Sequence, residues 1–459
     1  MRKFVAKPFL RLLKFSVLVV MACAGATRGI AQDTPTSSST SPVEQAANTQ
    51  QQTWNWHVQN TDIVEGHPGF PANYSGPNSL SSHNDIRNTE SLDLMAGLRL
   101  WPGAEAHVDG MMWQGFGFSN TLGAEGFPNG EAFRLGTKTP NENFARLFIR
   151  QTVGLGGEQE DISDDELTLR GKQDVSRLTF TVGRFSAKDI FDNNAYANDP
   201  RTQFMNWAFI ANEGWDFPAD ALGYTTGATV ELNQPSWTLR YGLFQVPQSV
   251  NGVGTDQHLL EAWGMVSEFE YRYAIDGHPG AVRPLVFLNR AQMGDYAEAV
   301  DSPTRPAVFP TSSSYRYKYG VGLNWEQEVA KDVGVFSRLG WSNGETQSWM
   351  FSDVDYAASL GLSVKGSTWG RPDDTVGLAG VYNGISKIHQ QFLADGGTGI
   401  LSGDGALSYG GEEVMETYYS FQIREGINFS LDFQFINHPA FNTDRGPVPV
   451  FGARLHFEY

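Results

Sequence analysis

Cysteine is almost absent from this chain of 459 residues, and its single example, Cys23, lies near the beginning. A basic head and a short apolar run lead to the small-residue sequence Gly29-Ile30-Ala31. This order is typical of a secretory signal peptide, so we expect residues 1–31 to be removed on export. The mature chain then has neither a disulfide nor thiol chemistry, although its destination permits disulfides.

This N-terminus allows two interpretations other than a signal peptide. A membrane anchor is disfavoured because the apolar run is too short to span a bilayer. A lipoprotein signal that ends in Val20-Met21-Ala22-Cys23 is the second alternative.

Positive charge is also scarce. The sequence has 33 Lys and Arg against 51 Asp and Glu, which gives a formal net charge of −18. The first 31 residues hold six of the basic residues and no acidic one, so the mature chain carries −24. A polyanion of this size repels a phosphate backbone, and we expect no nucleic-acid partner.

Long apolar runs are missing beyond the signal peptide. No stretch there approaches twenty residues and the mean hydropathy is −0.33, which excludes a transmembrane helix. Glycine (50 residues) and aromatic residues (13%) are abundant instead. An exported, acidic, cysteine-free chain of this composition is typical of a bacterial outer-membrane β-barrel.

Apolar and polar residues alternate in many segments of the chain, for example in 91–100, 314–327 and 427–437. This period of two predicts strands with one apolar face. The apolar rows end in aromatic residues and the opposite rows carry isolated charges, which places lipid outside and water inside. A sheet in lipid must close. We therefore expect an all-β, transmembrane antiparallel β-barrel of about sixteen strands, with short periplasmic turns and long extracellular loops.

The segments that we expect to be strands are 91–100, 104–114, 144–155, 165–172, 175–183, 223–233, 236–246, 261–274, 281–292, 314–327, 332–341, 355–366, 375–386, 413–424, 427–437 and 449–459. Long loops are expected near 116–141, 186–222, 343–354 and 387–412. The division that follows is a signal peptide over 1–31, a polar and partly disordered segment over 32–90, and a barrel over 91–459.

Several long phrases of the sequence resemble the carbohydrate-selective porins of the OprB type. They include "DVSRLTFTVGRFSAKDIFDNNAYANDPRTQFMNW" (174–207), "WGRPDDTVGLAGVYNGIS" (369–386) and "METYYSFQIREGINFSLDFQFINHPA" (415–440), followed by "FGARLHFEY". The resemblance extends from about Leu92 to the C-terminus. It implies a sixteen-stranded outer-membrane channel that admits glucose and similar sugars by diffusion, with arginines at its constriction. The chain departs from the family in its short N-terminal segment and in ending on Tyr459.

Strand alternation also nominates the cations that face the pore. A guanidinium is never neutral and presents five donors in a fixed fork, so it can hydrogen-bond sugar hydroxyls. The alternative is that these cations pair with Asp and Glu on neighbouring strands and brace the wall. The candidate pore-lining cations are Arg146, Arg150, Arg316, Lys318, Arg338 and Arg454, with Arg99 on the same kind of row.

The stretch "IFDNNAYANDPRTQFMNW" (190–207) is rich in Asn, Asp and aromatic residues but has no His, Cys or Ser. We hypothesise that it folds into or over the lumen and sets its width, with Asp192, Asn194 and Asp199 as polar contacts. Phe204 and the candidate site residues Trp207 and Trp215 would stack on sugar faces. The alternative is a rigid loop whose amides bond its own backbone.

The sequence offers little support for a metal-binding site or an enzyme active site. An EF-hand in the same stretch fails because Tyr196 stands where a ligand is needed, and a calcium ion there is not required. Gly154-Leu155-Gly156-Gly157 lacks the helix that a phosphate loop needs. The histidines form no ligand pair, and no serine lies in a nucleophile elbow. We expect no cofactor, no metal and no enzymatic activity.

Three functions remain in competition at this point. The leading one is passive diffusion of glucose and similar mono- or small oligosaccharides through the outer membrane. The alternatives are a general or cation-preferring porin without sugar selectivity, and a surface carbohydrate-binding protein that conducts nothing. The expected partners are permeating sugars and outer-membrane lipid, with a homotrimer as a possible assembly that the sequence does not distinguish from a monomer.

Overall fold

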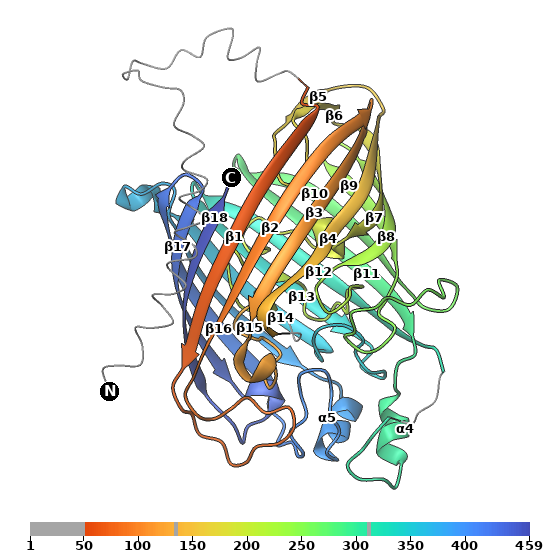
Figure 1. The fold of residues 1–459 in the computed structure, drawn as a ribbon, viewed down its shortest axis with the longest axis vertical. Helices are drawn as coiled ribbons and strands as arrows, with labels where there is room; N and C mark the ends of the chain where they lie inside the picture. Colours follow the sequence, from red (N-terminus) through yellow and green to blue (C-terminus); the bar gives the residue numbers. More distant parts are fainter. Residues whose placement is uncertain (1–50, 133–135, 310–313) are drawn as a thin grey trace.

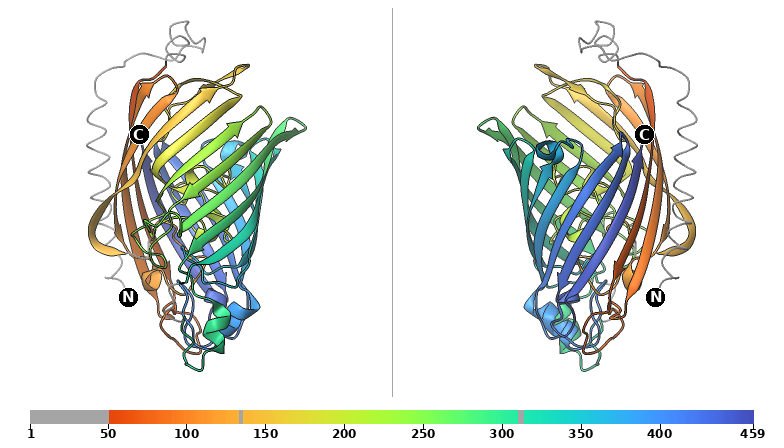
Figure 2. Two further views of the ribbon diagram at one scale, coloured as in Figure 1. Left: turned by 90° about the vertical axis from the view of Figure 1, so that its right-hand side faces the viewer. Right: turned by 90° about the vertical axis from the view of Figure 1, so that its left-hand side faces the viewer.

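Neighbouring strands of this chain pair antiparallel around a complete ring (Figures 1 and 2). The structure, a computed structural model, describes residues 51–132, 136–309 and 314–459. In these ranges sixteen strands form one barrel, in which the first strand pairs with the last. The all-β barrel class and the strand number are therefore confirmed. The predicted signal peptide lies outside the described residues.

The strands of the ring are β1 (Trp54–His67), β2 (Asp85–Trp101), β3 (Ala104–Gly115), β4 (Thr137–Gly154), β7 (Arg177–Phe185), β8 (Thr225–Asn233), β9 (Trp237–Phe244), β10 (Trp263–Ile275), β11 (His278–Ala291), β12 (Arg316–Ala330), β13 (Val333–Ser342), β14 (Tyr356–Lys365), β15 (Thr375–Gly384), β16 (Glu412–Arg424), β17 (Ile427–Asn437) and β18 (Val448–Glu458). A separate hairpin consists of β5 (Gln159–Ile162) and β6 (Gly171–Asp174). The short helices are α3 (Trp207–Ile210), α4 (Tyr296–Asp301) and α5 (Lys387–Ala394), with 3-10 turns η1 (Phe118–Asn120), η2 (Ala187–Asp189), η3 (Gly366–Trp369) and η4 (Pro439–Phe441).

The two faces of the wall differ as the alternation predicts. On β12 the side chains of Tyr317, Tyr319 and Val321 are exposed on the outside, whereas Lys318 is fully buried inside. Exposed apolar side chains continue around the ring, for example Leu360 on β14. Such a continuous apolar outer surface is stable against lipid but would be a large liability in water.

The two ends of the barrel also differ. Tight turns join the strands at one end, such as Asp276-Gly277 between β10 and β11, where both residues have positive φ (52° and 86°). Positive φ at both turn residues matches the turn to the right-handed twist of the two strands. Glycine adopts a positive φ at little energetic cost. The other end carries the long loops and the helices α4 and α5 (Figure 1). Short periplasmic turns and long extracellular loops are the usual arrangement of an outer-membrane barrel.

Two of the expected segments differ from the structure. The strand β1 lies inside residues 32–90, which we expected to be a polar segment outside the barrel, and it pairs with both β2 and β18. The expected barrel strand 165–172 is instead the tip and second arm of the β5–β6 hairpin, outside the ring. The sequence analysis thus omitted β1 and included one segment that lies outside the ring, so the expected number of barrel strands still equals the observed sixteen.

The apolar core lies inside the barrel, between its wall and the loops that enter it. Phe191 and Trp215 of the β7–β8 connection pack with Phe244 of β9 and Phe287 of β11. In the part of the chain that the structure describes, no helix is long and apolar enough to cross a membrane.

Candidate pore constriction

The connection between β7 and β8, residues 186–224, folds into the barrel and is here called the inner loop. Its backbone is held by carboxylates of distant strands: Glu268 of β10 accepts from the N–H of Asp192 (2.7 Å), and Glu416 of β16 accepts from the N–H of Asn206 (2.9 Å). These contacts fix the inner loop against one side of the wall. The hypothesis that residues 190–207 enter the lumen agrees with this placement.

Local sequence preferences shape the inner loop. Ser186 caps η2, and its side chain and that of Asp189 form a reciprocal capping box. Asn206 caps α3 through the N–H of Ala208. Asp192 has φ of 56°, a left-handed conformation that aspartate tolerates better than most residues. The abundance of Asn and Asp in this stretch is therefore partly explained by turns and caps.

Arg338 anchors the inner loop to β13. Its Nε lies 3.1 Å from Asp192 Oδ2, and its Nη atoms donate to the carbonyls of Phe209 and Ala197, both at 2.7 Å. Burial opposes ionisation of Asp192, but the charges of Arg338 and Lys188 outweigh it and lower the pKa of Asp192. Arg338 and Asp192 are both buried, so they hold the loop in place and leave no free face for a solute.

The inward orientation predicted for the other cations is correct, but several of them are also committed to protein partners. Lys318 lies 3.1 Å from Asp355 Oδ1 and is fully buried. Arg454 donates to the carbonyls of Pro200 and Gln203, at 2.6 and 2.8 Å. The bracing role that we weighed as the alternative therefore describes these two side chains.

Arg316 and Arg150 also face inward and donate to loop carbonyls. Arg316 lies 2.6 Å from Glu298 at the extracellular end and donates to the carbonyl of Met293. Arg150 donates to the carbonyl of Leu167 at 2.8 Å, near the periplasmic end.

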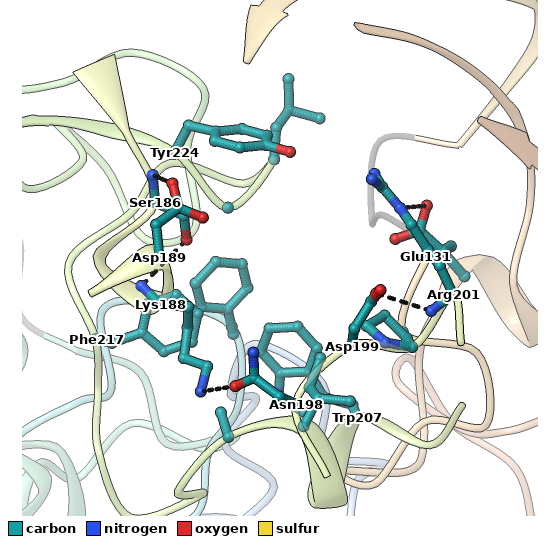
Figure 3. Close-up of a pocket in the computed structure, with 18 of the residues that line it drawn as sticks. Glu131, Ser186, Lys188, Asp189, Asn198, Asp199, Arg201, Trp207, Phe217 and Tyr224 are labelled. Carbon is teal, nitrogen blue, oxygen red and sulfur yellow. Dashed lines mark hydrogen bonds and ion pairs between the residues drawn. The ribbon is translucent and has the colours of Figure 1, made fainter. Parts of the chain in front are cut away.

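A cavity of about 360 Å³ remains between the inner loop and the wall of β1, β4 and the β3–β4 connection. Figure 3 shows its two sides, with Ser186, Asp189 and Tyr224 on one and Glu131 and Arg201 on the other. The charged side chains that line it are Glu131, Arg146, Glu166, Lys188, Asp189, Asp199 and Arg201.

Two arginines that line the cavity, Arg146 and Arg201, each form ion pairs with two carboxylates. Arg146 lies 2.7 Å from both Asp109 and Asp189, and its guanidinium lies 5.2 Å from the ring centre of Tyr224. Arg201 lies 3.1 Å from both Asp93 and Glu131. Ion pairs of this kind hold both guanidiniums in fixed positions at the lining of the cavity.

The three aromatic residues that were expected to stack on sugars do not all reach the cavity. Trp207 lines the cavity and stacks on Phe127, with ring centres 5.0 Å apart and planes 17° apart. Phe204 and Trp215 are buried elsewhere: Phe204 packs on Tyr418 and Trp215 on Phe191. Of the three rings expected to stack on sugars, the structure brings only Trp207 to the cavity. Phe127 covers one face of the Trp207 ring, so that face is not available to a sugar.

Of the predicted site residues, Arg146, Asp199 and Trp207 meet at the cavity. Asn194 is buried and donates to Asn324 of β12 at 2.8 Å. Sequence reasoning missed Arg201 and Glu131, because strand parity selects only residues on strands. Arg201 lies within the Asn- and Asp-rich stretch 190–207, where its positive charge is a signal that the sequence contains.

No metal-binding arrangement was found in the described ranges: groups of three or more His, Cys, Asp or Glu with suitable geometry are absent from them. The carboxylates around the cavity are instead paired with arginines and backbone N–H groups.

Comparisons with solved structures and with family profiles found matches for this chain. A structure of OprB from Pseudomonas putida at high pH superposes with a TM-score of 0.67 and 17% identity, covering 91% of this chain and 96% of that one. Its low-pH structure gives a TM-score of 0.49 and 13% identity, covering 91% of this chain and 95% of that one. A search of curated protein sequences found no match. The family profile described as "Carbohydrate-selective porin, OprB family" matches residues 78–459, and the chain therefore belongs to that family.

Proposed function

We propose that this chain lets glucose and similar mono- or small oligosaccharides diffuse passively across the outer membrane into the periplasm. Membership of the carbohydrate-selective porin family supports this function. The observation that carries it is the cavity of about 360 Å³, which lies inside a closed barrel and combines charged pairs with aromatic rings. Its size lies within the range of small-molecule sites.

The chemistry of the cavity suits a neutral polyol. A sugar that enters loses water, and the guanidiniums of Arg146 and Arg201 can donate to its hydroxyls while Glu131 and Asp199 accept from them. Each such bond contributes only about 0.5–1.5 kcal/mol net, because it replaces a bond to water. Several weak contacts in series allow the solute both to enter and to leave.

The predicted site residues take two roles in this proposal. Those that would contact the solute at the cavity are Arg146, Asp199 and Trp207. Those that would hold the inner loop or the wall in position are Asp192, Asn194, Trp215, Arg316, Lys318, Arg338 and Arg454. Arg150 belongs to the periplasmic side.

The same proposal places the barrel in the outer membrane with its apolar belt in lipid. Exposed rows such as Leu239, Tyr241 and Leu243 on β9 would contact hydrocarbon. Export through a signal peptide cleaved after Ala31 remains part of the prediction.

The test is block of ion conductance by glucose in a planar bilayer. Wild-type protein should form channels whose conductance falls as glucose is added. Arg201→Gln removes donors from the cavity and should weaken glucose binding roughly tenfold, since hydrogen bonds to a charged group contribute about 1.5–3 kcal/mol. The control is Arg305→Gln, an exposed arginine on an extracellular loop, which should bind glucose as the wild type does.

Channels that conduct ions without any effect of glucose would instead favour a porin without sugar selectivity. A folded barrel that does not conduct at all would favour a surface protein that only binds carbohydrate.

A further inference from the structure

The connection between β4 and β7, residues 155–176, forms the β5–β6 hairpin at the end of the barrel opposite α4 and α5 (Figure 1). Residues 163–170, here called the hairpin tip, join its two arms. The tip does not extend freely into the periplasm, because side chains from the inner face of the wall bind it.

Asn55 of β1 makes most of these contacts. Its Nδ2 donates to Asp164 Oδ1 (2.8 Å) and to the carbonyls of Asp165 (3.0 Å) and Thr168 (3.1 Å). Arg150 of β4 donates to the carbonyl of Leu167 at 2.8 Å. Asn55 and Arg150 both face inward, so the hairpin tip is tied to the inside of the barrel mouth.

Two residues of the tip reach the path of the solute. Glu166 and Leu167 line the cavity described above. Glu166 also lines a second cavity of about 760 Å³ at the periplasmic end, together with the turn between β16 and β17 and the C-terminal Tyr459. Glu166 of the hairpin tip therefore borders both cavities.

The amide of Gln59 on β1 continues the polar path from Glu166. Oriented for hydrogen bonding, it donates to Glu166 Oε1 at 3.2 Å and accepts from Nη1 of Arg201. Glu166 is thereby linked through Gln59 to Arg201, which lines the cavity. A sugar hydroxyl that leaves Arg201 can therefore pass to the carboxylate of Glu166.

We propose that the hairpin tip is a second constriction, at the periplasmic exit, where Leu167 sets the width and Glu166 offers the last polar contact before the vestibule. This inference rests on the proposed function, because it concerns the same solute path. It assigns a role in selectivity to a periplasmic turn, in addition to the inner loop.

The environment of Glu166 supports a role in passing a neutral solute. Burial and the nearby Asp199 raise the pKa of Glu166 to about 7, while Arg201 and Arg146 oppose the rise. Asp165 in the tip itself acts in the same direction as Asp199. A carboxyl group that is partly protonated near neutral pH can both donate to a hydroxyl and accept from it.

The experiment compares three variants by swelling of liposomes in isotonic glucose or a disaccharide, and by single-channel conductance in potassium chloride. Leu167→Trp should narrow the exit and lower both glucose swelling and conductance roughly threefold, because flux follows the width of the narrowest point. Leu167→Ala should raise both, and most strongly for the disaccharide. The matched control is Leu155→Trp, on the same connection but exposed and away from the cavities, which should behave as the wild type does.

If wild-type protein passes glucose and the Leu167 variants do not differ from it, the second constriction is refuted while the proposed function stands. If wild-type protein neither conducts nor passes glucose, the proposed function fails and this inference fails with it. Should Leu167→Trp fail to fold, Leu167→Ala decides the matter, since it removes bulk from a half-buried side chain and adds none.

Discussion

Arg338 illustrates how a pore-facing position can acquire a structural role. The alternation of β13 predicts its orientation, but its partners Asp192, Ala197 and Phe209 lie more than 120 residues away in the inner loop. No local pattern predicts which loop will enter the barrel or where a given guanidinium will meet it. Orientation could therefore be predicted from sequence, whereas the division into bracing and lining cations could not.

Replacing Arg338 by Ala should destabilise the folded protein by about 3–5 kcal/mol, because it leaves the buried Asp192 with a charge that has lost its main partner. The measurement is the free energy of unfolding in urea, followed by tryptophan fluorescence. The control is Arg87→Ala, which removes an exposed pair with Asp85 and should change stability by about 0–1 kcal/mol. Equal effects of the two substitutions would contradict the anchoring role.

Glu213, in the inner loop, gives a prediction for pH. Burial raises the pKa of Glu213 to about 8, although Ser352 donates a hydrogen bond to its carboxylate. The folded state therefore keeps a proton that the unfolded state has lost between about pH 5 and pH 8, and this contribution to stability falls as the pH rises.

Replacing Glu213 by Gln should remove that dependence. Relative to the variant, the wild type should lose about 1.4 kcal/mol per pH unit between pH 5 and pH 8. Unfolding free energies at four pH values in this range measure the difference. Glu345→Gln, an exposed substitution on a neighbouring extracellular loop, should leave the profile of the wild type unchanged. Parallel profiles for wild type and Glu213→Gln would disprove the assignment.

At the scale of elements, β1 was missed for a physical reason. Its outward row begins with Trp54, Trp56 and Val58 but continues with Asn60 and Asp62, so the apolar alternation breaks halfway. Its pore-facing row is polar except for Ile63, and the segment therefore has a composition close to that of a linker. Pairing with β2 and β18, which no local pattern reports, makes it a strand.

The expected strand at 165–172 fails for the opposite reason. Leu167 and Leu169 alternate with polar residues, which satisfies the pattern of a strand. The ladder partners of a wall strand are absent there, because β4 pairs directly with β7. Loops that enter a barrel can show the same alternation as its wall, since they too have one face against protein and one against water.

The importance of β1 can be tested by proline. Thr61→Pro places a residue without an N–H in a strand paired on both sides, and should cost about 3 kcal/mol or more. The fraction of heat-modifiable, folded barrel on a gel should fall. Val253→Pro, on an exposed extracellular loop, should fold like the wild type. Normal folding of Thr61→Pro would mean that β1 does not close the ring.

At the scale of the whole molecule, the proposed function requires that the outer side of the wall faces hydrocarbon. Leu360→Arg puts a charge at the middle of the outward row of β14 and should cost about 2–4 kcal/mol in a bilayer. Leu260→Arg, at a side chain that is 92% exposed on an extracellular loop, should be nearly neutral. Unfolding measured in lipid vesicles separates the two variants, and equal stability of both would argue against a lipid-facing belt.

The most direct test of the central claim, a water-filled sugar path inside a closed lipid-embedded barrel, is the initial swelling rate of liposomes that contain the purified protein in isotonic glucose. The account predicts swelling well above that of protein-free liposomes, with rates that fall as the sugar becomes larger. Swelling no faster than in protein-free liposomes, with the barrel shown to be folded in the same vesicles, would contradict it.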